Sequence, residues 1–219
     1  MTPPGDYERL CAVLERAQIQ GALGARPIAE VIDHANDFAA ALPTDVTSVL
    51  DLGTGAGIPG LVIAFARPSV QVTMVDRRAK RIDALQRAIV ALGWEARATA
   101  IAVDAEQLIG DPAWQWRHDA VVARGFADPR TTLRVAAQLT RTDGWVVISE
   151  PPAGSPTRWD PVWCEEFQVS GPERLGRVAR FHVEHGHQPP PNVLRGTQDE
   201  PPANVPRGTE PGESANRTD

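Results

Sequence analysis

Residues 50–60, LDLGTGAGIPG, form a glycine-rich segment that directly follows an apolar run. Such a loop can bind an anionic ligand where a helix begins, because glycine permits a tight turn and lets backbone N–H groups approach the ligand. Its second half, GAGIPG, also fits the G-x-G-x-x-G pattern of dinucleotide-binding folds. The segment therefore predicts a nucleotide-like ligand, held either by a pyrophosphate or by a carboxylate.

The position of the glycines relative to the preceding strand distinguishes a dinucleotide pyrophosphate from a ligand carboxylate. In a dinucleotide fold the first glycine of the fingerprint directly follows the strand. Here the apolar run ends at Leu52, and counting from Gly53 gives D-x-G-x-G-x-G with Asp51 at its head, so that the fingerprint begins two residues late. Two helical segments also precede the first strand, whereas dinucleotide domains commonly begin with that strand. An NAD oxidoreductase is therefore only a remote alternative.

Acidic residues close two of the following apolar runs. Asp76 ends VQVTMVD, which would place its carboxylate at the carboxyl edge of a parallel sheet, where ligands of such folds lie. There it could accept hydrogen bonds from both ribose hydroxyls, or it could simply cap the next helix. Asp104, Ala105 and Glu106 follow the next strand and would lie near an adenine, or would only begin an exposed helix.

The elements that must position these residues alternate along the chain. The expected strands are 46–52, 70–76, 97–103, 118–124 and 145–150, and the expected helices are 7–23, 27–42, 60–66, 79–93 and 130–139, with a turn over 140–144. This alternation predicts a parallel sheet covered by helices on both faces. Two further extended runs, 165–171 and 177–185, flank the turn-rich GPERLG and predict an antiparallel hairpin at the sheet edge.

Composition limits the class of protein. The net charge of −6 argues against sequence-independent coating of nucleic acid, although a local basic patch is compatible with it. Residues 187–219 are rich in Pro, Gly and charge, so we expect a disordered tail, in which PPPNVLRGT recurs as PPANVPRGT. Two cysteines are too few for a disulfide framework, and no apolar run approaches the ~20 residues of a membrane span. We expect a cytoplasmic monomer with no metal and no membrane partner.

The loop, the acid after the second strand and the terminal hairpin resemble the class I S-adenosylmethionine-dependent methyltransferases. Within that class the chain is similar to the RsmG (GidB) family, which methylates guanine N7 in bacterial small-subunit rRNA. The segments that carry the resemblance are LDLGTGAGIPGLVIA (50–64), VDRRAKRIDAL (75–85), VVARGFAD (121–128) and HANDF (34–38). The proline of GIPG is the most specific feature, because a proline after the third loop glycine is unusual in other methyltransferases.

The resemblance implies an α/β fold with a doubly wound, mostly parallel seven-stranded sheet. It divides the chain into an N-terminal helical extension (1–44), a methyltransferase domain that binds S-adenosylmethionine (45–186) and the tail (187–219). It implies transfer of a methyl group to guanine N7 of 16S rRNA, with 16S rRNA or the small ribosomal subunit as partner. The methionine carboxylate of the cofactor would lie in the glycine loop.

The resemblance also implies the residues of the site. The cofactor-binding candidates are Asp51, Gly53, Thr54, Gly55, Gly57, Asp76, Arg77, Asp104, Ala105, Glu106 and Arg124. Arg124, at the mouth of the fourth strand, is also the catalytic candidate. The substrate-binding candidates are His34, Asp37, Lys80 and Arg81. Alternatively, His34 and Asp37 form a hydrogen-bonded pair on a helix surface, and Lys80 and Arg81 belong to a solvated helix face.

Three positions depart from the family pattern on the substrate side. Ala22-Leu23-Gly24 stands in place of Asn-Leu-Thr, Arg124-Gly125 in place of Arg-Ala, and Glu150-Pro151 in place of a lysine and a glycine. An acid at the rim of a site for RNA phosphate is expected to repel it. Two alternatives therefore stay open: a methyltransferase of the same fold that acts on a small molecule or another RNA, and a non-catalytic paralogue that binds S-adenosylmethionine.

Overall fold

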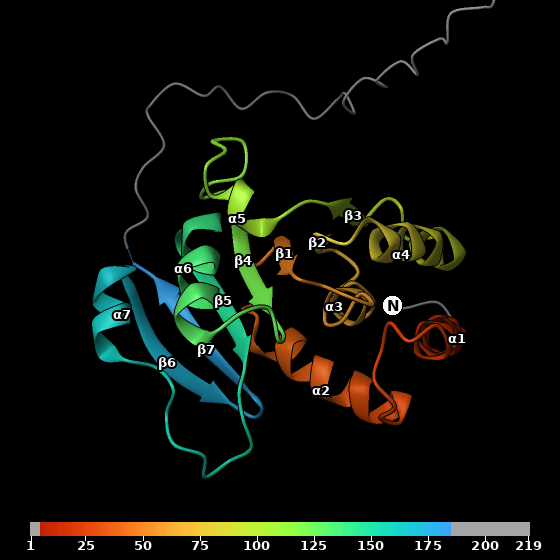
Figure 1. Cartoon of the computed structure of the whole chain (residues 1–219), viewed down its shortest axis with the longest axis horizontal. Coiled ribbons are helices and arrows are strands. Elements are labelled where there is room, and N and C mark those ends of the chain that lie inside the picture. Colours follow the sequence, from red (N-terminus) through yellow and green to blue (C-terminus); the bar gives the residue numbers. More distant parts are fainter. Residues whose placement is uncertain (1–4, 185–219) are drawn as a thin grey trace, which may run out of the picture. The chain divides into compact units, whose positions relative to one another are not determined.

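The computed structural model describes residues 5–184 and has a seven-stranded sheet at its centre, in the order β3-β2-β1-β4-β5-β7-β6 (Figure 1). The strands are β1 (Ser48–Leu52), β2 (Gln71–Asp76), β3 (Ala98–Ala102), β4 (His118–Ala123), β5 (Thr140–Ser149), β6 (Val169–Leu175) and β7 (Val178–Val183). Strands β1 to β5 pair in parallel, and β7 is antiparallel to both β5 and β6. The predicted mostly parallel sheet with a terminal hairpin is confirmed.

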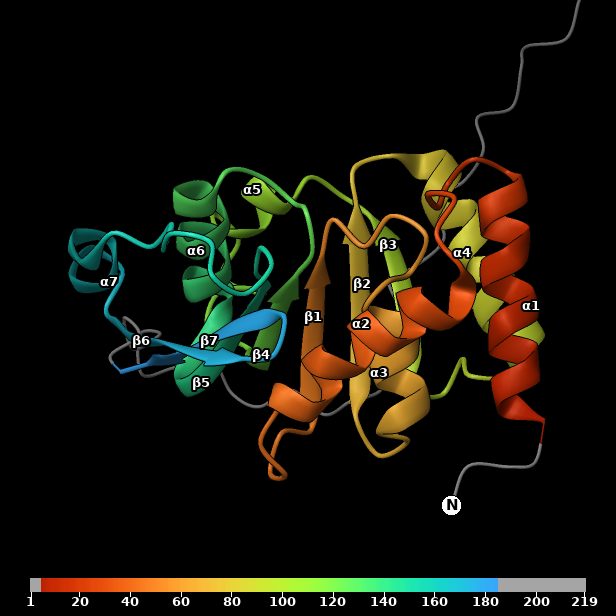
Figure 2. The ribbon, with the colours of Figure 1, turned by 90° about the horizontal axis from the view of Figure 1, so that it is seen from below.

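Helices cover both faces of the sheet (Figures 1 and 2). One face carries α1 (Asp6–Ile19), α2 (Ile28–Ala41), α3 (Gly60–Ala66) and α4 (Ala79–Leu92), and the other carries α5 (Ala105–Leu108), α6 (Pro129–Leu139) and α7 (Pro161–Glu166). The described part of the chain has no helix with the length and hydropathy of a membrane-spanning segment. The predicted tail and its repeat lie outside the described residues.

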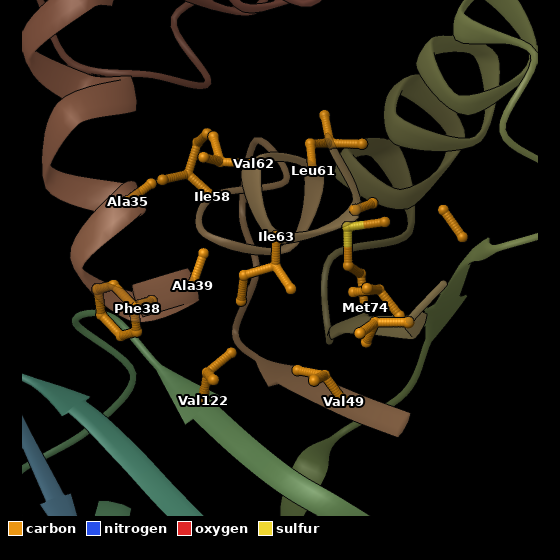
Figure 3. Close-up of a cluster of buried hydrophobic side chains, with 14 of the residues drawn as sticks. Ala35, Phe38, Ala39, Val49, Ile58, Leu61, Val62, Ile63, Met74 and Val122 are labelled. Atoms are coloured by element: carbon orange, nitrogen blue, oxygen red, sulfur yellow. The ribbon is translucent and has the colours of Figure 1, made fainter. Parts of the chain in front are cut away.

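Strand periodicity explains why the sheet has a core on each side. Successive strand residues point to opposite faces, so Val49 packs beneath α2 and α3 while Leu50 packs in the other layer. Figure 3 shows α3 over the sheet with α2 at its side; Ile63 points toward Val49 and Val122, and Phe38 and Ala39 of α2 lie beside them. This packing holds the beginning of α3, and with it the end of the glycine loop, against the sheet.

The structure corrects three details of the expected elements. Strand β5 begins at Thr140, directly after α6, where a turn over 140–144 is predicted. Helix α7 takes the beginning of the extended run expected over 165–171, because Asp160 caps it by accepting from Val162 N and Pro161 suits the first helical turn. The residues GPERLG lie largely within β6 rather than in a turn, because β6 pairs there with β7.

At the amino edge of the sheet, Asp119 of β4 connects two segments: the loop that precedes β1, and strand β5. Its carboxylate accepts hydrogen bonds from Thr47 N and Oγ1 (2.8 and 2.7 Å), Ser48 N (2.9 Å) and Arg141 Nε (2.7 Å). Burial by itself would raise the pKa of Asp119, but these bonds outweigh it and hold the pKa well below its usual range. The carboxylate is therefore ionised in the folded protein at neutral pH.

Replacing Asp119 with Asn is expected to lower the free energy of unfolding by about 2 kcal/mol at neutral pH, because the amide loses charge-assisted bonds. Folding lowers the pKa of Asp119. Its contribution to the free energy of unfolding is therefore complete above the carboxyl pKa of the unfolded chain, about 4, and is lost as the pH falls below that value. Urea unfolding from neutral pH downward measures this. The difference in the free energy of unfolding between wild type and Asp119→Asn should become smaller only at acidic pH. The control is Asp45→Asn, at an exposed site of the loop before β1, which should leave stability unchanged.

Candidate functional site

A cavity of about 490 Å³ lies at the carboxyl edge of the sheet, where β1, β2, β3 and β4 end. The predicted site residues that line it are Gly53, Asp76, Arg77, Arg81, Asp104, Ala105 and Glu106. The lining residues that are not among the predicted site residues are Val75, Arg78, Val103, Gly125, Phe126 and Ala127. All of these lie within a few residues of a strand's carboxyl end, so the strand boundaries themselves carry the signal that could have found them.

The glycine loop needs its glycines for backbone conformation and for space. Gly53 and Gly57 have φ of 65° and 90°, in the left-handed region that favours glycine. A Cβ on Gly57 would lie 2.7 Å from Leu85 Cδ1 and 2.8 Å from Leu61 Cδ1, and one on Gly53 would lie 2.9 Å from Phe126 Cδ2. Packing against these neighbours therefore requires glycine at both positions, and Gly53 presents bare backbone to the cavity.

Asp51 braces the loop from behind and does not line the cavity. Its side chain is fully buried, and Oδ2 accepts hydrogen bonds from Thr54 Oγ1 (2.6 Å) and Gly60 N (2.9 Å). Burial raises the pKa of Asp51 to about 7, against the opposing effect of these bonds and of the Arg124 charge. Within the described residues, Oδ1 has no partner. Asp51 and Thr54 therefore shape the loop, whereas Gly53 faces the cavity.

Asp76 combines both roles that its sequence position allows. Its Oδ1 accepts from Arg78 N (2.9 Å), at the beginning of α4, and its Oδ2 accepts from Gly55 N (3.1 Å) in the loop. Arg81 Nη1 lies 3.7 Å from Oδ2. The carboxylate thus ties the end of β2 to the glycine loop while it lines the cavity.

The residues after β3 likewise form both a helix start and a wall of the cavity. Asp104 Oδ1 accepts from Glu106 N (3.0 Å) and so caps α5, which begins at Ala105. All three residues also line the cavity. The two interpretations of this segment are therefore compatible.

Arg124 follows β4 as a half-buried cation that lies outside the lining of the cavity. Burial lowers the pKa of its guanidinium, while the nearby charge of Asp51 raises it. It makes no hydrogen bond or ion pair with any residue in the range 5–184. Because the half-buried guanidinium has no hydrogen-bond or ion-pair partner among the described residues, it is available to an anionic or carbonyl group.

His34 and Asp37 lie on α2, apart from Lys80 and Arg81 at the beginning of α4. Asp37 Oδ2 accepts from Arg177 Nε (2.5 Å) and thereby joins α2 to the turn between β6 and β7. Burial, then the charges of Arg124 and Arg177, lower the pKa of His34, so its imidazole is neutral at neutral pH. Of the four substrate candidates, the cavity includes only Arg81.

Glu150 does not form the repulsive rim expected from its charge. Its side chain is 7% exposed, and Oε1 accepts from Trp159 Nε1 (2.7 Å) and Arg158 Nε (3.2 Å). Arg174 Nη1 lies 3.3 Å from Oε2. Two guanidinium groups thus surround one carboxylate and neutralise its charge. The expectation that Glu150 repels RNA phosphate is therefore wrong.

The strand order, the terminal hairpin and the glycine cradle opposite Asp76 define a class I S-adenosylmethionine-dependent methyltransferase fold. The cofactor-bound Rv0187 structure from MTB shares the fold with a TM-score of 0.56 and 16% identity, over 81% of this chain and 91% of that one. A SAM-dependent methyltransferase from Aquifex aeolicus aligns with a TM-score of 0.51 and 13% identity, over 70% and 90% of the two chains.

The family model described as rRNA small subunit methyltransferase G, GidB, matches residues 22–150, and the chain belongs to this family. A curated relative, the ribosomal RNA small subunit methyltransferase G of Nocardioides sp., is 35% identical over 133 residues. That alignment covers 60% of this chain and 47% of the relative. The chain thus spans about half the length of the curated relatives that it matches.

Proposed function

We propose that this chain transfers the methyl group of S-adenosylmethionine to guanine N7 of 16S rRNA in the cytoplasm. The observation that carries the proposal is the convergence, at one cavity, of a glycine cradle, an acid after β2 and the capped segment after β3. Membership of the rRNA small subunit methyltransferase G family supports 16S rRNA as the methyl acceptor. The internally neutralised Glu150 removes the main charge argument against an RNA substrate.

The residues of the cavity fit S-adenosylmethionine. The bare backbone of Gly53 would take the methionine end, since Gly53 lines the cavity. Asp76 would accept from the ribose hydroxyls, and Ala105 and Glu106 would lie along the adenine. These roles use lone pairs of Asp76 that remain beside its bonds to Gly55 N and Arg78 N.

The chemistry asked of the protein is positioning. Bound in the cradle, S-adenosylmethionine supplies a methyl group already activated by a sulfonium, so the N7 lone pair of guanine needs no prior loss of a proton. The chain's own residues then have to orient the acceptor and exclude water. Arg124 is the candidate for orienting the acceptor or the donor, because its half-buried guanidinium makes no hydrogen bond or ion pair with a described residue.

Mass spectrometry of 16S rRNA from a strain that lacks this gene tests the acceptor. Loss of one N7-methylguanosine, restored by the wild-type gene, is the expected result. Unchanged rRNA from a protein that binds S-adenosylhomocysteine would indicate another acceptor or a paralogue without catalysis. Failure to bind S-adenosylhomocysteine would contradict the donor assignment as well.

Replacing Asp76 with Ala is expected to weaken the binding of S-adenosylhomocysteine by about 1–3 kcal/mol, because charge-assisted bonds to the ribose hydroxyls are lost. Isothermal titration calorimetry measures the change. Asp76→Asn keeps an acceptor for a backbone N–H and should hold the loop better, yet should still bind less tightly than wild type. Asp83→Ala removes an acid from α4 outside the cavity lining and should not alter the affinity; equal affinities for all variants would remove the assignment.

A further inference from the structure

The cationic side chains of the described residues differ in how they are used along the chain. Every arginine from residue 130 to residue 184 pairs with a carboxylate; they are Arg130, Arg134, Arg141, Arg158, Arg174, Arg177 and Arg180. Before residue 130, several cations make no side-chain hydrogen bond or ion pair with any described residue; they are Arg16, Arg26, Arg77, Arg78, Lys80, Arg87, Arg117 and Arg124. Although the net charge of the chain is negative, the chain therefore contains a group of unpaired cations before residue 130.

Two of these unpaired cations border a groove between α1 and α4, the two helices that lie side by side in Figure 2. The groove has a volume of about 320 Å³, with Arg16 on its α1 side and Arg81 and Arg87 on its α4 side. No Asp or Glu is among the described residues that line it. Its electrostatic character is therefore positive, although the chain as a whole is acidic.

The floor of the groove is apolar because both helices present small side chains there. Alanines and Val13 from α1 face alanines and Leu85 from α4; the alanines are Ala12, Ala17, Ala84, Ala88 and Ala91. Val13 and Ala17 are four residues apart, and Ala84, Ala88 and Ala91 follow at intervals of four and three, so each set lies on one side of its helix. Methyl groups are too short to fill the space between two helices, so a hollow remains.

The groove adjoins the carboxyl-edge cavity. Gly55 and Ala56 of the glycine loop line its inner end. Arg81 lines both the groove and the cavity, and its Nη1 lies 3.7 Å from Asp76 Oδ2. An RNA strand whose acceptor base lies beside the cofactor cavity can therefore extend into the groove.

We propose that the groove between α1 and α4 is a docking surface for the sugar–phosphate backbone of the substrate RNA, a deepening that rests on the proposed function. Arg16 and Arg87 contact phosphates on the two sides, and the apolar floor takes the flat face of a sugar or base. The partner follows from charge complementarity, because unpaired guanidinium groups without an acid among them suit a polyanion. The RNA thus approaches over α1 and α4 rather than over the β6–β7 hairpin, whose arginines are ion-paired.

The test compares the Arg16→Gln/Arg87→Gln double variant with wild type in binding to unmethylated 16S rRNA and to a short oligouridylate over a range of salt. The variant is expected to bind both RNAs about tenfold more weakly near physiological salt. Its plot of log affinity against log salt should be shallower by about 1.4, since each lost phosphate contact to single-stranded RNA removes about 0.7. In methyl transfer, KM for rRNA should rise while kcat is retained.

Arg117→Gln is the matched control, because Arg117 is an exposed arginine without a described partner that precedes β4, at the opposite edge of the sheet. It should leave the salt slope unchanged, and all variants should bind S-adenosylhomocysteine as wild type does. If the wild type methylates rRNA but the double variant shows the same salt dependence of RNA affinity as the wild type, the proposed role of the groove is overturned. The proposed function is then left intact. A wild type that neither binds nor methylates RNA would overturn both.

Discussion

Glu150→Lys, which restores the residue type usual in the family, is expected to lower the free energy of unfolding by about 3 kcal/mol. The wild-type carboxylate is 7% exposed and is the shared partner of Arg158 and Arg174. A lysine there would leave two guanidinium groups without a carboxylate beside a third cation, and Trp159 Nε1 without its acceptor. Removing one member of a buried charge network costs far more than the network contributes relative to an apolar replacement.

Urea unfolding measures this change, and two variants define its cause. Glu150→Gln keeps an acceptor for Trp159 Nε1 and should destabilise less than Glu150→Lys. Glu166→Lys breaks the exposed pair with Arg130, whose side chains are 43% and 52% exposed, and should cost less than about 1 kcal/mol. If Glu150→Lys proved as mild as Glu166→Lys, Glu150 would not be the centre of a buried network, and the argument that its charge is hidden from RNA would fail with it.

The second large effect is expected at the end of the glycine loop, where Gly60→Ala should cost about 3 kcal/mol. A Cβ on Gly60 would lie 2.5 Å from Met74 Cγ and 2.8 Å from Asp51 Oδ2. Neither neighbour can move freely, because Met74 is fully buried and Asp51 holds Thr54 and the Gly60 N–H. Overpacking of this kind forces side chains off their rotamers and shifts backbone.

Thermal unfolding should show this as a fall in Tm of about 6–12 °C, given roughly 2–4 °C per kcal/mol for a chain of this size. Affinity for S-adenosylhomocysteine should fall as well, since displacing Asp51 distorts the cradle. Gly24→Ala is the control, because a Cβ there would meet nothing within 4 Å. In combination with Met74→Ala, the Gly60→Ala cost should shrink, and strict additivity of the two changes would refute the contact with Met74 as its origin.

The local features of this protein could be predicted from its sequence. The alternation of apolar strands and helices, the glycine loop after Leu52 and the acid at position 76 all depend on residues close together in the chain. Backbone preferences and side-chain periodicity act over a few residues, so they determine which segments are strands or helices and which residues end them. Because parallel strands share a carboxyl edge, Gly53, Asp76 and Asp104 could also be expected near one another, and they line one cavity.

Only the tertiary structure decided which partners distant side chains find. Glu150 faces outward as a lone acid in a sequence argument, yet folding brings Arg174 of β6 against it. Asp37 pairs with Arg177, 140 residues later, and α1 meets α4 to form a groove that neither helix predicts by itself. Charge neutralisation and cavity shape depend on which elements pack together, and that is set by the summed burial of many weak contacts rather than by any local pattern.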